Sequence, residues 1–262
     1  MPEGDTLHKI ANRLRPALVG AGVERFDAPR LTGPRPGAGT TVVAVEAVGK
    51  HLMVTFDDGV VLHTHLRMTG SWHLYERGER WRKPRHLARV VIATARHEAV
   101  CFNAPVVRTT VGVSDAVDHL GPDLCRADAD IDDVLDRMAR IPEPGTTIAE
   151  VLLDQRVAAG IGNVYKSEVL WAERLDPRTP IGEVPADLRR RLVETAARLL
   201  RANLTTTRRT TVPGGLAVYR KARRPCRRCG TPIRMARWGE QARSTYWCPR
   251  CQVHPAGTAR GS

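Results

Sequence analysis

The stretch DQRVAAGIGNVYKSEVLW (residues 154–171) decides the architecture of the second half of the chain. Apolar residues recur at helical spacing over 148–158 and over 163–175, which predicts a helix on each side of a short connection. That connection, residues 159–163, has room only for a tight turn, so it presents Asn163 and backbone N–H groups at a helix start, a place that can hold a phosphate. The glycine pattern alone is a weak signal, because a plain helix–helix turn also explains it and the Walker pattern is lacking.

Helical periodicity continues outward from this stretch. Residues 132–141 and 186–204 carry apolar stripes of the same spacing. A helical domain over 131–222 is therefore expected, preceded by an acidic linker over 116–130.

Strand signals dominate the first part of the chain. Asp5 is the expected N-cap of a helix over 5–19, and Pro16 is expected to bend or shorten its end. Runs rich in β-branched residues then predict strands at 41–48, 52–56, 60–64, 87–94 and 99–102. The expected fold class is α+β, with a leading helix and a β-sandwich or barrel forming a domain over 1–115.

Four of the six cysteines form two Cys-x2-Cys pairs that are separated by 18 residues. This spacing is typical of a structural zinc site, whereas a redox pair or surface disulfides are the alternatives. Two matched pairs favour a zinc-finger hairpin over 223–255 that binds one Zn²⁺ through Cys226, Cys229, Cys248 and Cys251.

The charge distribution points to a polyanionic partner. The chain has 41 basic and 28 acidic residues, and its last segment, 201–262, holds 14 basic residues against one acid, Glu240. Nucleic acid is the favoured partner, and a solvated basic tail is the alternative. No apolar run approaches the roughly 20 residues of a membrane span, and the start MPEGDTLHK lacks a signal-peptide core. A cytoplasmic protein without a membrane partner is expected.

Pro2 and Glu3 open the chain ahead of the first predicted helix. If Met1 is removed, Pro2 is a secondary amine that is partly unprotonated near neutral pH and can attack a sugar carbon to give an iminium. An adjacent carboxylic acid such as Glu3 can carry the proton. Taken alone, the two residues are more simply an extended N-terminus.

The whole chain resembles the formamidopyrimidine-DNA glycosylase/endonuclease VIII family of base-excision repair enzymes. The resemblance rests on MPEGDT at the start, Gly49-Lys50-His51-Leu52, the stretch 154–171 and the four-cysteine finger, which occur in one order over residues 2–252. It implies a β-sandwich lobe, a helical lobe with a helix-two-turn-helix, and a zinc-finger hairpin.

The resemblance also implies roles for single residues. Pro2 is the implied Schiff-base nucleophile and Glu3 the acid/base, while Lys50 contacts phosphate and assists β-elimination. Arg243, in ARSTYWCPRC, is associated with the lesion's phosphates and δ-elimination. Asn163 grips the phosphate backbone.

Two further positions follow from the same family pattern. Glu168, in YKSE, matches a buried acid near the N-terminal amine. Met68, in HLRMTGSW, occupies the position of the wedge that fills the gap left by a flipped nucleotide, with a core methionine as the alternative. Nearby, His51, His63 and His65 give no evidence of a metal site.

Two departures bear on the substrate. Residues 101–108, CFNAPVVR, lack the Arg-Phe-Gly motif of purine-specific members, although Arg108 could contact DNA. The segment 203–226 is short, which leaves little room for a loop that caps 8-oxoguanine. With the PEGDT start, these features favour an endonuclease VIII-like enzyme for oxidised pyrimidines.

The leading hypothesis is a bifunctional DNA glycosylase and abasic-site lyase that cuts by β,δ-elimination. It is expected to bind damaged DNA as a monomer, associated with the nucleoid when acting. The alternatives are an oxidised-purine glycosylase and a catalytically silent zinc-finger protein that binds damaged DNA.

Overall fold

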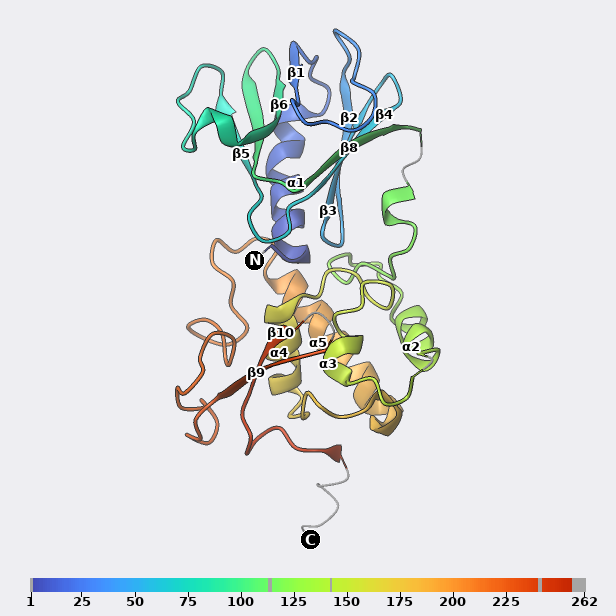
Figure 1. Ribbon diagram of the computed structural model, residues 1–262, viewed down its shortest axis with the longest axis vertical. Coiled ribbons are helices and arrows are strands. Elements are labelled where there is room, and N and C mark those ends of the chain that lie inside the picture. The colour runs from blue at the N-terminus through green and yellow to red at the C-terminus, as the bar shows by residue number, and fades with distance from the viewer. Residues whose placement is uncertain (1, 113–114, 142, 240–241, 256–262) are drawn as a thin grey trace. The chain divides into compact units, whose positions relative to one another are not determined.

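The computed structural model describes residues 2–112, 115–141, 143–239 and 242–255. The chain divides into two compact units, Met1–His119 and Leu120–Ser262 (Figure 1). The first unit holds the strand-rich part of the sequence, and the second holds the helices and the four-cysteine hairpin. The four-part division expected above remains a prediction.

Helix α1 (Gly4–Leu18) opens the first unit. Its N-cap is Glu3, and Asp5 lies inside the first turn, so the prediction of Asp5 as the cap was wrong. The carboxylate of Asp5 instead lies 3.5 Å from the Lys9 ammonium, one turn further along. Pro16 lies inside the last turn, where it removes one helix hydrogen bond, and the helix ends two residues later at Leu18.

Two antiparallel four-stranded sheets form the β-sandwich of this unit. One has the order β2-β3-β4-β8 and the other the order β1-β6-β7-β5. Apolar residues from both sheets pack with the buried face of α1 in one core. The strands are β1 (Arg25–Asp27), β2 (Val42–Val48), β3 (His51–Phe56), β4 (Val60–His65), β5 (Ser71–Glu76), β6 (Ala88–Ala93), β7 (His97–Phe102) and β8 (Val106–Val111).

The sequence patterns missed β1, β5 and β8. Strand β1 has three residues, and the other two carry polar side chains such as His73 and Arg108 among their apolar ones. Their pairing partners, β6, β7 and β4, supply the ladders that hold them in place.

The second unit is built around a buried helix. Helix α4 (Asn163–Ala172) is buried from Asn163 to Trp171, and α5 (Ala186–Ala202), α2 (Ile131–Ala139) and α3 (Ile148–Val151) contribute to the core around it. The helix expected over 148–158 was predicted too long. It ends at Val151, and the chain continues to α4 in two successive turns, as a helix-two-turn-helix requires.

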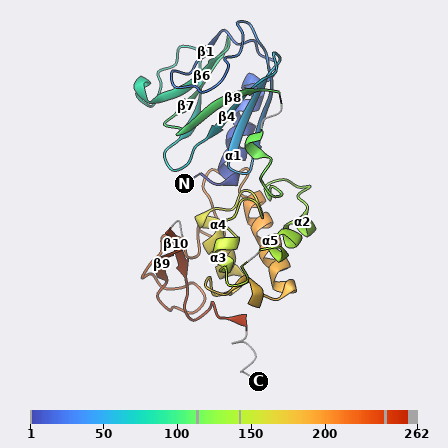
Figure 2. The same cartoon turned by 45° about the vertical axis from the view of Figure 1, so that its right-hand side comes forward.

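The finger hairpin consists of the antiparallel strands β9 (Arg234–Trp238) and β10 (Arg243–Trp247). Strand β10 packs against α4, and both views show the two elements side by side (Figures 1 and 2). Trp171 of α4 joins Ile233 and Cys248 in a small apolar cluster below the hairpin. Among the described residues, no helix combines the length and apolar character needed to cross a membrane.

Candidate nucleic-acid site and metal centre

Pro2 and Glu3, two of the residues with a predicted chemical role, open the first unit. Pro2 is half-buried directly before α1, and the Glu3 residue is 0% exposed at its N-cap. The Glu3 carbonyl accepts the N–H groups of Thr6 and Leu7 at 2.9 and 3.3 Å, so the helix begins at once behind Pro2. Figure 1 shows the N-terminus, the β2–β3 hairpin and the β4–β5 loop at the same end of the unit.

Lys50 and Met68 lie on those two loops. Gly49 and Lys50 form the two-residue turn between β2 and β3, where Gly49 takes a left-handed φ of 56°. Met68 is 61% exposed on the β4–β5 loop, so the alternative of a core methionine is wrong. The loop ends at Gly70, whose backbone packs closely against Leu66. A side chain would not fit there, because a Cβ on Gly70 would lie 2.8 Å from the Leu66 Cα.

A chain of hydrogen bonds runs across the outer face of the sheet beside Lys50. The Arg108 guanidinium donates to His63 Nδ1 at 3.0 Å, and His63 Nε2 lies 2.7 Å from His51 Nδ1. Because a guanidinium can only donate, neutral His63 carries its proton on Nε2 and donates it to His51, whose own proton is then on Nε2. His65 pairs with His51 across the strands, with ring centroids 4.8 Å apart.

These imidazoles are held in the neutral form. Burial, followed by repulsion from His65 and His63, lowers the pKa of His51 to about 3. Burial is also the largest cause that lowers the pKa of His63 and of His65 to about 4, with Arg108 adding to the first effect. The Lys50 ammonium is among the cations that lower the pKa of His65. Arg108 donates from Nε to His63, and its possible contact with DNA stays a prediction.

In the second unit, the turn that precedes α4 is braced by Gln155. Its side-chain amide donates to the carbonyls of Leu153 and Ile161 at 2.8 and 3.0 Å, and its oxygen accepts the N–H of Gly160 at 3.1 Å. Gly160 takes a φ of 103°, a conformation that side chains rarely adopt. This bracing delivers Asn163 to the first position of α4, as the sequence predicted.

Asn163 and Arg243 belong to neighbouring elements of this unit. Asn163 is 6% exposed, and its Oδ1 lies 3.3 Å from the Lys166 ammonium one turn further along α4. Arg243 is exposed at the start of β10, which packs against α4. Nothing in the sequence patterns singled out Lys166 or Gln155: Lys166 meets β10 only through folding, and the contacts of Gln155 lie within one irregular turn that has no periodic signal.

Glu168 is buried as predicted, and it anchors the segment that follows α5. Its carboxylate accepts the backbone N–H groups of Ala217, Val218 and Tyr219 at 2.7, 2.9 and 2.8 Å, and also the Thr211 hydroxyl. Such charge-assisted bonds offset the cost of burying a carboxylate. Its predicted place near the N-terminal amine stays a prediction.

The four finger cysteines form a metal centre. Their sulfur atoms all lie within 4.8 Å of one another, with Cys226 and Cys251 Sγ 3.9 Å apart and Cys229 and Cys248 Sγ 3.5 Å apart. Tetrahedral Zn–S bonds of 2.3 Å place sulfurs about 3.8 Å apart, so the set fits one Zn²⁺. All six cysteines are free, which removes the disulfide alternative.

Arg228, which lies between two of these cysteines in the sequence, binds the C-terminal end of α4. Its guanidinium stacks on the Trp171 ring at 3.8 Å and donates to the carbonyls of Trp171 and Ala172 at 2.5 and 3.0 Å. Cations are favourable at the carbonyl end of a helix, and Arg228 therefore both caps α4 and offsets the thiolate charge.

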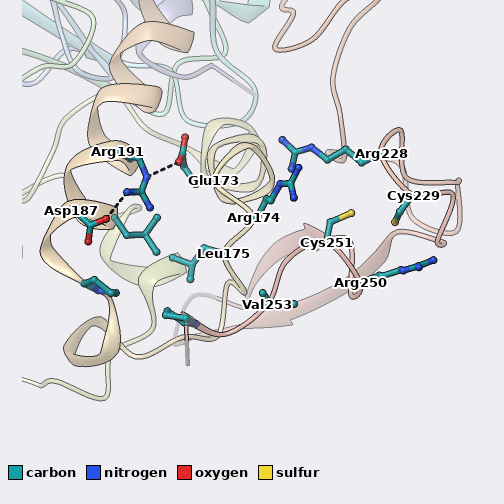
Figure 3. Close-up of a pocket in the computed structure, with 13 residues that line it drawn as sticks. Glu173, Arg174, Leu175, Asp187, Arg191, Arg228, Cys229, Arg250, Cys251 and Val253 are labelled. Carbon is teal, nitrogen blue, oxygen red and sulfur yellow. Dashed lines mark hydrogen bonds and ion pairs between the residues drawn. The ribbon is translucent and has the colours of Figure 1, made fainter. Parts of the chain in front are cut away.

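A surface pocket of about 770 Å³ lies between this end of α4, the start of α5 and the finger (Figure 3). Both of its carboxylates bind Arg191, Asp187 at 2.5 Å and Glu173 at 3.5 Å, and three further arginines line it, Arg174, Arg228 and Arg250. None of the residues with predicted chemical roles other than Cys229 and Cys251 lines it, so it is not the candidate reaction site.

Comparisons with known proteins agree with this arrangement. Residues 1–110 match the formamidopyrimidine-DNA glycosylase N-terminal domain, residues 120–212 its H2TH domain, and residues 224–253 the zinc finger found in FPG and IleRS. The chain is 45% identical over 268 residues to a probable endonuclease 8 2 of Streptomyces coelicolor, covering 98% of this chain and 95% of that protein.

Two more similarities complete the comparison. A DNA-(apurinic or apyrimidinic site) lyase of Mycolicibacterium smegmatis is 38% identical, with 97% of this chain and 99% of that protein covered. A crystal structure of the Lactococcus lactis formamidopyrimidine-DNA glycosylase in complex with DNA containing an abasic site superposes with a TM-score of 0.79 at 21% identity, covering 96% of this chain and 99% of that one, and shows the shared fold. The chain therefore belongs to the formamidopyrimidine-DNA glycosylase/endonuclease 8 family, whose members are DNA glycosylases and abasic-site lyases.

Proposed function

We propose that this protein binds damaged DNA, removes oxidised pyrimidines and cleaves the resulting abasic site through a Schiff base on Pro2. The observation that carries the proposal is the junction of Pro2 with α1, where a half-buried proline adjoins the fully buried Glu3. Once Met1 is removed, the amine of Pro2 lies beside the positive end of the helix dipole, which disfavours its ammonium form and keeps a nucleophile available.

The reaction follows from the chemistry of that amine. Pro2 nitrogen attacks C1′ of a flipped nucleotide, a C–N bond forms, and the glycosidic bond breaks with the electron pair leaving on the base. Opening of the sugar ring gives an iminium, and Glu3 carries the proton that this step moves. Loss of a proton from C2′ then expels the 3′ phosphate by β-elimination, and a second elimination expels the 5′ phosphate.

The remaining residues bind the DNA around this centre. We assign phosphate contacts to Lys50, Asn163 and Arg243, since ammonium, amide and guanidinium groups all donate to phosphate oxygens. The exposed side chain of Met68 is assigned to the gap in the base stack, which an apolar wedge fills when a nucleotide is extruded.

Two compact segments support the choice of pyrimidines. Asn103, with a φ of 52°, makes a tight turn between the buried Phe102 and Ala104, where the Arg-Phe-Gly motif of purine-specific members would be expected. The segment 203–226 is held down at both ends. Asn203 binds the backbone of Leu199 and Thr210 at one end, and Glu168 binds 217–219 at the other.

The first test is borohydride trapping of the Met1-processed protein on a duplex that contains an abasic site. We expect a covalent protein–DNA band that is absent in Pro2→Ala and retained in Glu3→Gln, because Glu3 is needed to expel a base and not to form the imine at an existing abasic site. No band from the protein with Met1 removal confirmed by mass would support the silent DNA-binding alternative.

Substrate choice is tested separately by comparing excision of 5-hydroxyuracil and thymine glycol with excision of 8-oxoguanine. Faster release of the two pyrimidines is expected. Preferential release of 8-oxoguanine would replace the pyrimidine assignment by the oxidised-purine alternative, without affecting the role of Pro2.

A further inference from the structure

Lys166 is a cation buried in the second unit, and the proposed reaction does not use it directly. The residue is 1% exposed, yet its ammonium lies 2.7 Å from Thr245 Oγ1, 3.2 Å from the Ser244 carbonyl and 3.3 Å from Asn163 Oδ1. Burying an ammonium is costly unless its N–H donors meet acceptors, and these contacts with described residues supply such acceptors. The acceptors come from two different elements, α4 and β10.

The contact with Lys166 fixes the orientation of the Asn163 amide. An ammonium group can only donate, so the Asn163 atom that faces it must be the oxygen. The Nδ2 group therefore points away from Lys166 and keeps its two N–H donors for another acceptor. A phosphate oxygen is the acceptor that this amide would meet in the proposed complex.

The same ammonium holds the finger strand. Ser244 and Thr245 directly follow Arg243 at the start of β10, and Thr245 is 2% exposed. A second link lies beside this one, because the Tyr246 N–H donates to Ser167 Oγ at 3.4 Å. Lys166 thus fixes the start of α4 and the strand behind Arg243 against each other.

We propose that Lys166 is a positioning residue that orients the Asn163 amide for phosphate binding, next to the strand that carries Arg243. The inference rests on the proposed function, in which those two side chains bind phosphates. An apolar side chain of similar length would fill the same volume without burying a charge, so packing alone does not require a lysine here. Preorganisation gains affinity because the amide no longer has to be ordered when DNA binds.

A double-mutant cycle tests the inference. Affinity is measured for a duplex that carries a tetrahydrofuran abasic-site analogue, using the zinc-loaded protein, Lys166→Met, Asn163→Ala and the double variant. We expect each single change to weaken binding about tenfold, and the double variant to be weakened little more than either, because both remove the same oriented amide. Lys221→Met is the matched control, since it removes one lysine charge from the same unit at a residue whose ammonium donates to the Leu216 carbonyl.

The possible results distinguish a failure of the positioning role of Lys166 from a failure of the phosphate contact proposed for Asn163. Independent effects multiply, so a double variant whose affinity for the duplex is about a hundredfold weaker would overturn the positioning role. A Lys166→Met protein with the same affinity as Lys221→Met would also overturn it. If Asn163→Ala itself binds the analogue as tightly as the unaltered protein, the proposed phosphate contact fails. If Asn163→Ala is weakened and Lys166→Met is not, only the present inference fails.

Zinc content and melting temperature show whether a variant has kept its fold. If Lys166→Met loses zinc or unfolds, Thr245→Val tests the same contact. It removes the β10 hydroxyl that Lys166 binds and leaves Lys166 and Asn163 unchanged. We expect it to weaken binding about threefold, with no further loss in the Asn163→Ala background. Unchanged binding by folded Thr245→Val would count against the inference.

Discussion

Two polar clusters, one in each unit of this protein, are buried in opposite ways. The first unit places His51 and His63 on a sheet face, where burial keeps both imidazoles neutral. The second unit places Lys166 and Glu168 on the buried helix α4, where both are almost fully removed from water. Three backbone N–H groups bind Glu168, and Lys166 contacts three acceptors among the described residues.

The difference shows how a fold can accommodate buried ionisable groups. A charge is retained where the backbone and neighbouring side chains supply enough hydrogen bonds to replace water, as around Glu168. Where burial is the main effect and neighbours such as Lys50 and Arg108 are cations, the imidazole stays neutral. The histidine cluster of the first unit is therefore buried in the neutral form, whereas Lys166 and Glu168 of the second unit are buried with hydrogen-bond partners.

Removal of zinc should give the largest difference between the units. Chelation or Cys248→Ser should unfold the finger, because structural zinc contributes about 10–16 kcal/mol in isolated finger peptides. Hydrogen exchange followed by mass spectrometry should show lost protection in β9 and β10 and unchanged protection in β3 and β4. DNA binding should fall by at least about tenfold, as phosphate contacts from the finger are lost.

A chelator already saturated with zinc serves as the control for that experiment. Undiminished DNA binding by the zinc-free protein would show that the finger does not contribute to DNA binding. Loss of protection in β3 and β4 would show that the two units do not respond independently.

Replacing Glu168 should have the next largest effect, confined to the second unit. Glu168→Ala leaves the N–H groups of residues 217–219 buried without their acceptor, which should cost about 3–5 kcal/mol. Calorimetry should show a melting temperature lower by roughly 10 °C, with a smaller loss in Glu168→Gln, which keeps one oxygen. Exposed Glu194, 4.0 Å from Arg190, is the control, and Glu194→Gln should change stability by less than about 0.5 kcal/mol.

Acid should destabilise the first unit through its histidines. Their pKa values are about 3 to 4 in the folded chain and 6.5 when unfolded, so the unfolded state binds more protons between these limits. The stability they contribute is complete above pH 6.5 and is lost as the pH falls toward 3. At pH 5 the loss should be about 2 kcal/mol after allowance for solvent screening.

Hydrogen exchange of β3, β4 and β8 at pH 7 and pH 5, corrected for the intrinsic rate, measures this loss. His63→Gln should reduce the pH dependence, since it removes the imidazole bound by Arg108. Equal protection at both pH values would show that the histidines accept protons without opening the sheet.

Met68→Ala should have the smallest effect on stability, under about 0.5 kcal/mol, because the side chain is 61% exposed. Binding to the tetrahydrofuran duplex should nevertheless weaken about fivefold, while binding to undamaged duplex stays unchanged, because only a gap in the stack takes a wedge. Val111, 69% exposed on the same unit, is the control: Val111→Ala should change neither. Equal weakening on both duplexes would argue against the wedge.

Much of the fold was readable from short-range patterns. Cysteine spacing predicted the finger and its Zn²⁺, because metal geometry restricts the ligands to fixed offsets along the chain. Hydrophobic periodicity predicted α1, α4, α5 and most strands of the sandwich, whereas α3 was predicted too long and Asp5 was wrongly expected as a cap. The resemblance to a known family added the roles of Pro2, Lys50 and Asn163, which remain proposals for this chain.

Tertiary structure decided the rest. Lys166 meets Thr245 across 79 positions of sequence, Glu168 binds the N–H of Val218 across 50, and Arg108 binds His63 across 45. Only folding makes these contacts, because pairings at such separations depend on the packing of whole elements and leave no periodic signal in a single sequence. The sequence by itself determined which groups could bind zinc and donate to phosphate, and the packing of α4 and the sheets determined which charges are partnered and which imidazoles stay neutral.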